Sequence, residues 1–172
     1  MLGVVGLAVL VLGGHSVPAV PCSVRDLRES PGYLWRIERV EANVDSATRI
    51  VRVRAVAADS VAHTMSFEPL EWIRGTASTE RLVLPGTAVD EDDFNTRPVP
   101  YRTVRPSGQR RSCNTEEYRI GAQYLLLLRD GTGFSPLYWW PLGPVNEQLR
   151  GDNDLWLAWV RAHVAARKSS HH

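Results

Sequence analysis

Two cysteines are the most reactive side chains in this chain of 172 residues. In an oxidising compartment an even number of cysteines favours a disulfide, and Cys22 and Cys113 permit one intramolecular bridge. Closing a loop of about 90 residues would stabilise the fold by roughly 4 to 5 kcal/mol in the chain-entropy model. A nucleophilic cysteine would need a histidine beside it, and no sequence pattern supplies one. We therefore predict a structural disulfide between Cys22 and Cys113.

A long segment without periodicity, residues 87–112, carries an acidic block followed by arginines, prolines and two aromatic residues. The acidic block could bind calcium, but it lacks the alternating spacing and the glycine of a calcium-binding loop. We predict no metal and no cofactor. Long loops in compact domains are usually functional or disordered. The functional reading predicts a protein-binding loop formed by Asp90, Glu91, Asp92, Asp93, Phe94, Arg97, Tyr101, Arg102 and Arg105.

The alternative for this segment is a neutral, disordered insertion. Alternating charge blocks can steer a partner electrostatically, and prolines limit the cost of ordering a loop on binding. In either case we expect the segment to be separable from the fold, so that deleting residues 90–105 would leave the fold intact.

A catalytic site would have to be assembled from residues distant in the sequence. His63, Glu68 and Glu71 are candidates for such a site, although His63 has no second ligand at metal-binding spacing. No nucleophile, metal-ligand or paired-carboxylate pattern stands out elsewhere. We therefore favour a non-catalytic binding or inhibitor-like module, with an envelope enzyme and a structural envelope protein as alternatives.

Composition narrows the classes of partner. The net charge is +1 and 44% of residues are hydrophobic, which suits one globular domain with a substantial core. A general binder of nucleic acid or membrane surfaces needs an excess of positive charge on one face. We predict a protein partner and no nucleic acid, and we make no prediction of oligomeric state.

The first 19 residues have the pattern of a secretory leader. They are apolar from Leu2 to Leu12, become small and polar, and end in Val17, Pro18 and Ala19. The apolar run is shorter than the roughly 20 residues that span a bilayer. We predict a signal peptide over residues 1–19, a periplasmic or extracellular location, and no membrane span in the mature chain. A membrane-tethered N-terminus is the alternative.

The elements that would position these residues are mostly strands. Four consecutive leucines, Leu125 to Leu128, lie in a short apolar run bounded by Gly121 and Gly131. An apolar run at both parities predicts a central strand covered on both faces. Alternating side chains predict a half-exposed strand at residues 50–55, and a return strand follows at 63–73. Pro69 cannot donate to a β-ladder, so it predicts an edge or a bulge. Shorter strands are predicted at residues 81–84 and 134–140.

Two helices flank the strands. The first begins at Ser30 and Pro31, follows an apolar stripe through Val44, and ends at Asp45 and Ser46. The second begins at residues 152–154. One face of it is predicted to contain Leu155, Trp156, Trp159, Val160, His163 and Val164. Residues 168–172 are predicted to be a disordered tail.

Several segments together resemble one known family. They are Cys22-Ser23, residues 50–55, residues 67–75, Cys113 and residues 121–128. The chain from Cys22 to Val164 is similar to the netrin-like OB-fold of the tissue inhibitors of metalloproteinases. More narrowly, it resembles uncharacterised bacterial exported proteins that begin Cys-Ser-x-Arg and finish with Val-Asn-Glu, matched here by Val145, Asn146 and Glu147.

The resemblance implies a mainly β fold, a small five- to six-stranded OB-like barrel with an N-terminal and a C-terminal helix, in one domain over residues 20–167. Animal inhibitors of this type chelate a protease zinc through an N-terminal cysteine within a Cys-x-Cys start. Here Pro21 precedes Cys22, and Val24 stands where the second cysteine belongs. The resemblance therefore does not extend to zinc-protease inhibition, because one scaffold of this kind carries many functions.

Overall fold

The computed structural model describes residues 39–102, 104–107, 116–131, 133–136, 138–139 and 143–170. In chain order the elements are α2 (Arg39–Ser46), β1 (Arg49–Asp59), β2 (Thr64–Arg74), β3 (Leu82–Pro85), β4 (Thr87–Val89), β5 (Glu117–Arg119), β6 (Gln123–Gly131), β7 (Gly133–Pro136), β8 (Tyr138–Trp139), β9 (Gly143–Pro144), β10 (Asn146–Leu149) and α4 (Leu155–Ser169). None of the helices in this part of the chain is both long and apolar enough to cross a membrane. The predicted leader, Cys22 and Cys113 lie outside the described residues, so cleavage and the disulfide stay predictions.

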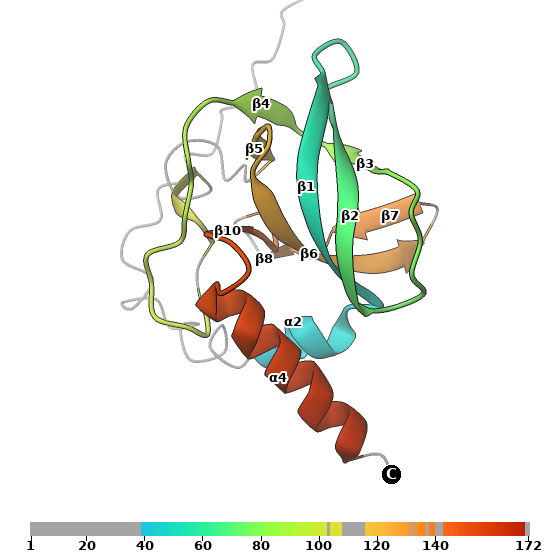
Figure 1. Ribbon diagram of the computed structural model, residues 1–172, viewed down its shortest axis with the longest axis vertical. Helices are drawn as coiled ribbons and strands as arrows, with labels where there is room; N and C mark the ends of the chain where they lie inside the picture. Colours follow the sequence, from blue (N-terminus) through green and yellow to red (C-terminus); the bar gives the residue numbers. More distant parts are fainter. Residues whose placement is uncertain are drawn as a thin grey trace, which may run out of the picture.

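The fold is built on one antiparallel sheet with the strand order β10-β6-β1-β2-β3, and β7 pairs with the far end of β6 (Figure 1). Strands β3 and β10 lie at opposite edges, and no pairing joins them among the described residues. The predicted mainly β class is confirmed, but the predicted closed barrel is wrong. The chain after β4 lies along the edge of β10 through a parallel bridge between Phe94 and Gln148, so that edge is covered by a loop and not by a closing strand.

Strand β6 is the central strand that the leucine run predicted. It pairs with β1 on one side and with β10 and β7 on the other. Leu125 and Leu127 pack in the core beneath α2 and α4, whereas Leu126 and Leu128 pack in the core on the opposite face. Gly121, the glycine that bounds the predicted run at its start, lies at φ 85° in the turn that separates β5 from β6.

The β1–β2 hairpin also follows the sequence pattern. Val51, Val53 and Ala55 are buried on one face, and the arginines between them lie on the other. Pro69 pairs with Val53 next to a shift in register. Because β3 pairs only with the Thr64–Phe67 part of β2, Pro69 also lies on an open edge, as its missing N–H predicted.

Helix α4 begins where predicted, because the Asp154 carboxylate accepts hydrogen bonds from the backbone N–H groups of Trp156, at 2.8 Å, and Leu157, at 3.5 Å. Trp156, Val160 and Val164 are buried against the sheet. The predicted face is wrong at Leu155, which is 72% exposed. The helix continues to Ser169, so the first two residues of the predicted tail are helical.

Helix α2 ends at Ser46 as predicted, while its predicted start lies outside the described residues. Arg74, at the end of β2, donates to the carbonyl oxygens of Val44, Asp45 and Ala47. A cation at this position satisfies carbonyls left open at a helix C-terminus. This contact fixes α2 to the sheet beside α4, and Figure 1 shows the two helices together at one end of the molecule.

Candidate functional site

The segment after β4 packs onto the fold instead of projecting from it. Of the nine candidate partner-binding residues, Asp93, Tyr101 and Arg105 are buried, with 6%, 3% and 0% exposure. Phe94 is partly buried, and the exposed remainder comprises Asp90, Glu91, Asp92, Arg97 and Arg102. The expectation that this segment is separable from the fold is therefore wrong, since deleting residues 90–105 would remove part of the core.

A buried ion pair fastens this segment to the sheet. Arg105 contacts the Asp93 carboxylate at 2.8 Å, donates to the Glu117 carbonyl at 2.7 Å, and approaches Asn146 Oδ1 at 3.4 Å. Its guanidinium also lies 5.3 Å from the ring centroid of Tyr118. A buried charge is tolerated when a counter-charge and further hydrogen bonds replace its water. These contacts supply both for Arg105.

Glu147 is a second buried carboxylate beside this pair. It is 1% exposed and accepts a hydrogen bond from Asn95 Nδ2 at 3.2 Å. Burial raises its pKa from 4.5 to about 7, although the Arg105 charge and the Asn95 hydrogen bond act in the opposite direction. Asp93 already neutralises Arg105, so a protonated Glu147 leaves this buried cluster without net charge. Glu147 has almost no solvent exposure, so its contacts lie within the interior of the protein.

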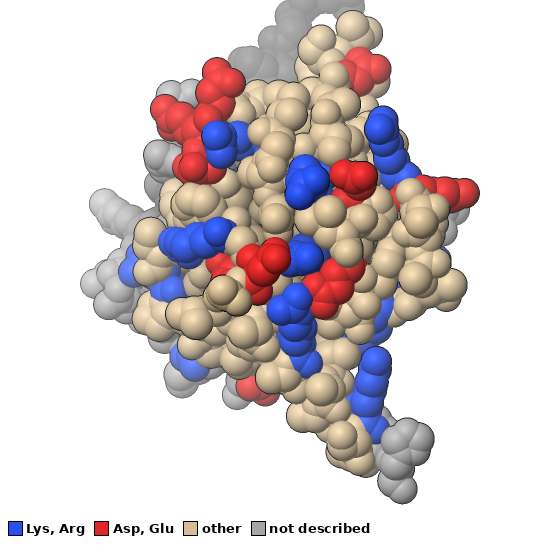
Figure 2. All heavy atoms as spheres, in the orientation of Figure 1, with Lys and Arg blue, Asp and Glu red and all other residues tan. Residues whose placement is uncertain are grey.

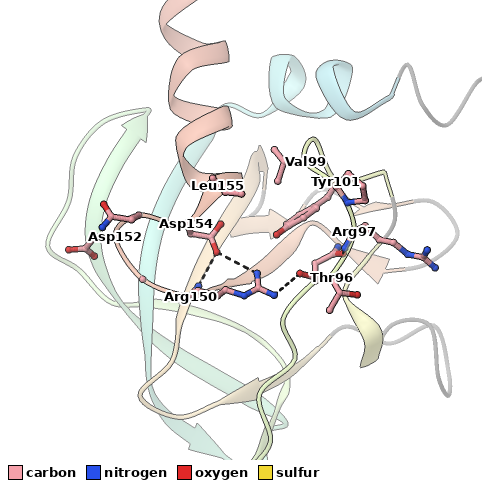
Figure 3. Close-up of a pocket in the computed structure, with 12 residues that line it drawn as sticks. Thr96, Arg97, Val99, Tyr101, Arg150, Asp152, Asp154 and Leu155 are labelled. Atoms are coloured by element: carbon pink, nitrogen blue, oxygen red, sulfur yellow. Dashed lines mark hydrogen bonds and ion pairs between the residues drawn. The ribbon is translucent and has the colours of Figure 1, made fainter.

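A pocket of about 490 Å³ opens between residues 95–101 and residues 150–155. Figure 3 shows the side chains that surround it. The lining residues are Asn95, Thr96, Arg97, Pro98, Val99, Tyr101, Arg150, Gly151, Asp152, Asn153, Asp154 and Leu155. One wall is thus the predicted binding segment, and the other is the turn that leads into α4.

Contacts between the two walls hold the pocket open. Tyr101 stacks on Trp156 of α4, with ring centroids 5.2 Å apart and an interplanar angle of 26°. Arg150 donates to the Asn95 carbonyl at 3.0 Å and lies 4.0 Å from the Asp154 carboxylate (Figure 3). Burial raises the pKa of the Tyr101 hydroxyl, and the nearby Asp154 carboxylate adds to this effect. Tyr101 therefore stays neutral at physiological pH.

The pocket is lined by two arginines, two aspartates and several apolar groups, and Figure 3 shows the Arg97 side chain directed away from Arg150. Both of its carboxylates are engaged, since Asp154 caps α4 and Asp152 contacts Arg52 Nη1 at 2.5 Å. Arg97 is exposed, and its side chain makes no ion pair with the part of the chain that the structure describes. Leu155 adds an apolar side chain that is 72% exposed at the rim.

The chemistry of this pocket suits binding. Among the described residues that line it there is no histidine, cysteine or serine. General acid–base or nucleophilic catalysis needs a group with a free proton site or lone pair within reach of substrate. Of the groups in the lining that could take such a role, Asp154 is held by the N-terminus of α4 and Asp152 by Arg52, and Thr96 and Tyr101 contribute hydroxyl groups.

The structure does not bring together the three residues of the predicted enzyme alternative. His63 lies exposed in the turn between β1 and β2, at φ 50°. Glu71 lies eight residues along the chain, which is about 26 Å in an extended strand. Glu68 lies 3.9 Å from Arg54, while Glu71 contacts Arg161 at 3.0 Å. Figure 2 shows basic and acidic side chains interspersed on this view of the molecule.

The acidic block does not form a ligand cluster either. Asp93 points inward to Arg105, whereas Asp92 contacts Arg119 at 3.1 Å and Gln148 at 2.6 Å. The described part of the chain contains no group of three or more residues placed to hold a metal ion.

Asn146 and Glu147 entered the sequence analysis only as part of a family motif, and neither the burial of the polar residues of β10 nor the pocket formed by the turn after it was predicted. Asn146, Glu147 and Gln148 are all buried, and Gln148 accepts the Asp93 N–H at 2.7 Å. The available signal was a short polar run flanked by Val145 and Leu149, which are buried. A buried polar strand requires partners, and those partners lie 28 to 56 residues earlier in the chain.

The chain was compared with protein-family models, with curated proteins and with solved structures, and none of the three comparisons found a match.

Proposed function

We propose that this protein is an exported, non-catalytic module that binds another protein through the pocket between residues 95–101 and 150–155. The main support for this proposal is that contacts within the protein hold both walls of the pocket in place. The Asp93–Arg105 ion pair, the Tyr101–Trp156 stack and the Arg150–Asn95 hydrogen bond fix both walls before any ligand arrives. A preformed site avoids much of the ordering cost of binding.

The groups at the rim suit a protein partner. Arginine and aromatic residues are enriched at the centres of protein interfaces, where polar groups surround them. Here Arg150 and Leu155 lie at the hollow with their side chains partly or largely exposed, and the buried Tyr101 ring backs its wall. Export is supported by the leader pattern of residues 1–19. The netrin-like, inhibitor-type relationship is part of the proposal and rests on the sequence segments quoted above.

Site-specific crosslinking tests the proposal. A photoreactive amino acid is placed at Leu155 or at Thr96, and, as a control, at Val83, which is 56% exposed on β3. The full chain is then incubated with exported proteins of the producing cell, and crosslinked species are identified by mass spectrometry. We expect the same protein to be crosslinked from both pocket positions and not from Val83. Crosslinks of equal yield at all three positions, or none at the pocket, would contradict the proposal.

A further inference from the structure

We propose that Glu147 is a proton-controlled latch, which holds the segment after β4 against β10 while it is protonated and loosens that contact when it is ionised. The segment, residues 93–105, includes one wall of the pocket, residues 95–101. Its loosening would therefore disturb the surface where the partner binds. This consequence rests on the proposed function, whereas the latch itself is a property of the fold.

Glu147 lies where the segment meets the sheet. It is 1% exposed on β10, accepts a hydrogen bond from Asn95 Nδ2 at 3.2 Å, and also bonds with the backbone N–H of Arg105. Burial raises the pKa of the Tyr101 hydroxyl, and the charges of Asp154 and Glu147 add to this effect, so Glu147 lies close behind the pocket wall. Because the segment supplies these neighbours, moving it away would bring water to the Glu147 carboxyl group.

The cation that acts on Glu147 already has a partner. Arg105 contacts the Asp93 carboxylate at 2.8 Å, and both residues belong to the segment. An ionised Glu147 would place a second buried negative charge beside this one positive charge. Burial accordingly raises the pKa of Glu147 from 4.5 to about 7, although the Arg105 charge opposes the shift.

The other elements around this face of the sheet engage their charges elsewhere. Strand β6 places the apolar Leu125 beside Glu147 in register. The turn before α4 supplies Arg150 and Asp154, whose side chains lie 4.0 Å apart. The side chains of α4 that form ion pairs contact Glu71 on β2 or Asp45 on α2, and they are Arg161, His163 and Arg167.

The segment can move without the sheet because different contacts hold the two. The segment is joined to β10 through the Asp93 N–H, which Gln148 accepts at 2.7 Å, and through the bridge between Phe94 and Gln148. Strand β10 keeps its own pairing with β6. Opening has to expose Tyr101 and Val104 of the core, so ionisation of the latch shifts an equilibrium that apolar burial opposes.

The direction of the pH dependence follows from the proton affinity of the two forms. The closed form binds the Glu147 proton more tightly than an open form in which water reaches the carboxyl group. Opening therefore becomes more favourable as the pH rises from 4.5 to about 7, and it changes little above that range. The equilibrium constant for opening should increase at least about tenfold between pH 5.5 and pH 8.

Amide hydrogen exchange of the full chain, followed by mass spectrometry at pH 5.5 and pH 8, measures this opening once the intrinsic exchange rates are divided out. We expect the protection factor of peptides from residues 93–105 to fall at least about tenfold over this range and to stay below that of β6 peptides at both pH values. A protection factor in the segment that does not change with pH would overturn the proposal. Equal protection of the segment and β6 would also overturn it, because the segment would then open only by global unfolding.

A matched pair of variants assigns the effect to Glu147. Glu147→Gln stays neutral at both pH values, so its segment should keep its protection factor within about twofold. Glu91→Gln changes an exposed residue and should retain the native dependence. If both variants behave like the native chain, another group controls the opening and the latch is rejected, while the native chain alone decides whether the opening depends on pH. A partner crosslinked at Leu155 without any pH-dependent exchange would retain the proposed function and reject the latch.

Discussion

At the scale of single residues, Arg105 determines how the segment after β4 behaves. Its guanidinium has 0% exposure, and its partners come from three parts of the chain: Asp93 before it, and Glu117 and Asn146 after it. Removing one member of a buried ion pair leaves the other as an uncompensated charge. The Asp93–Arg105 pair, together with the contacts of Arg105 to Glu117 and Asn146, therefore holds this wall of the pocket against the strands.

The first prediction concerns the stability that Arg105 contributes. Arg105→Met keeps the apolar part of the side chain but leaves Asp93 without its counter-charge. We expect it to lower the free energy of unfolding by about 3 to 5 kcal/mol. Arg102→Met is the matched control, because Arg102 is exposed, and it should change stability by less than about 0.5 kcal/mol. Urea denaturation measures both, and equal small effects would show that the ion pair does not hold the segment.

The second prediction concerns the pH dependence that Glu147 imposes. Burial raises its pKa from 4.5 to about 7, so the folded state binds the proton more tightly than the unfolded state does. Its contribution to stability is therefore complete below pH 4.5 and is lost as the pH rises to about 7. The loss amounts to about 3 kcal/mol.

Glu147→Gln should remove this loss, because a glutamine stays neutral and can still accept the hydrogen bond from Asn95. The free energy of unfolding of the variant should rise relative to that of the native chain by about 3 kcal/mol between pH 4.5 and pH 8. Urea titrations across this range measure the difference, with the exposed Glu91→Gln as control. Parallel curves for Glu147→Gln and the native chain would show that Glu147 does not titrate in this way.

At the scale of elements, the local sequence pattern was enough to predict the structure where it depends on which face of a single strand or helix is buried. The four leucines of β6 divide between two cores because successive strand residues point to opposite faces. Asp154 caps α4, and Pro69 lies at an open, shifted edge. Each of these outcomes depends on residues that are neighbours in the sequence or lie on one strand.

The buried polar network could not be predicted in the same way. Charged residues in a segment rich in proline are usually solvated, and nothing in the spacing of Asp93, Arg105 and Glu147 indicates that they meet. Their contacts arise because the segment crosses the edge of β10, which is a property of the tertiary fold. For the same reason the sequence placed Arg97 and Tyr101 in a binding segment but did not pair it with Arg150 and Leu155.

The third prediction concerns the packing of α4. Trp156 is 0% exposed and stacks between Tyr101 and Trp159, with centroids 5.2 Å away on each side. Trp156→Ala should cost about 3 to 5 kcal/mol, and Trp159→Ala should cost less because Trp159 is only partly buried. Leu155→Ala is the exposed control on the same helix. Thermal or urea unfolding that ranked Trp159 above Trp156 would contradict this packing.

At the scale of the whole molecule, the sheet and α4 together hold one preformed hollow. The sheet fixes β10, β10 fixes the segment after β4 through buried polar contacts, and α4 supplies the second wall. The arginines of the β1–β2 face are paired with carboxylates, and in the hollow Arg150 is paired with Asp154.

The most direct measurement compares two double variants of the full chain in the capture of exported proteins, quantified by mass spectrometry. Arg97→Glu with Leu155→Ser alters the pocket, and Arg81→Glu with Val83→Ser makes the same chemical changes near the edge strand β3. Urea unfolding first establishes that both variants are as stable as the native chain. We expect the pocket variant to capture at least about tenfold less partner than the native chain does. The β3 variant should capture as much partner as the native chain. Retention by both variants, or equal loss from both, would contradict the claim that this pocket is the binding surface.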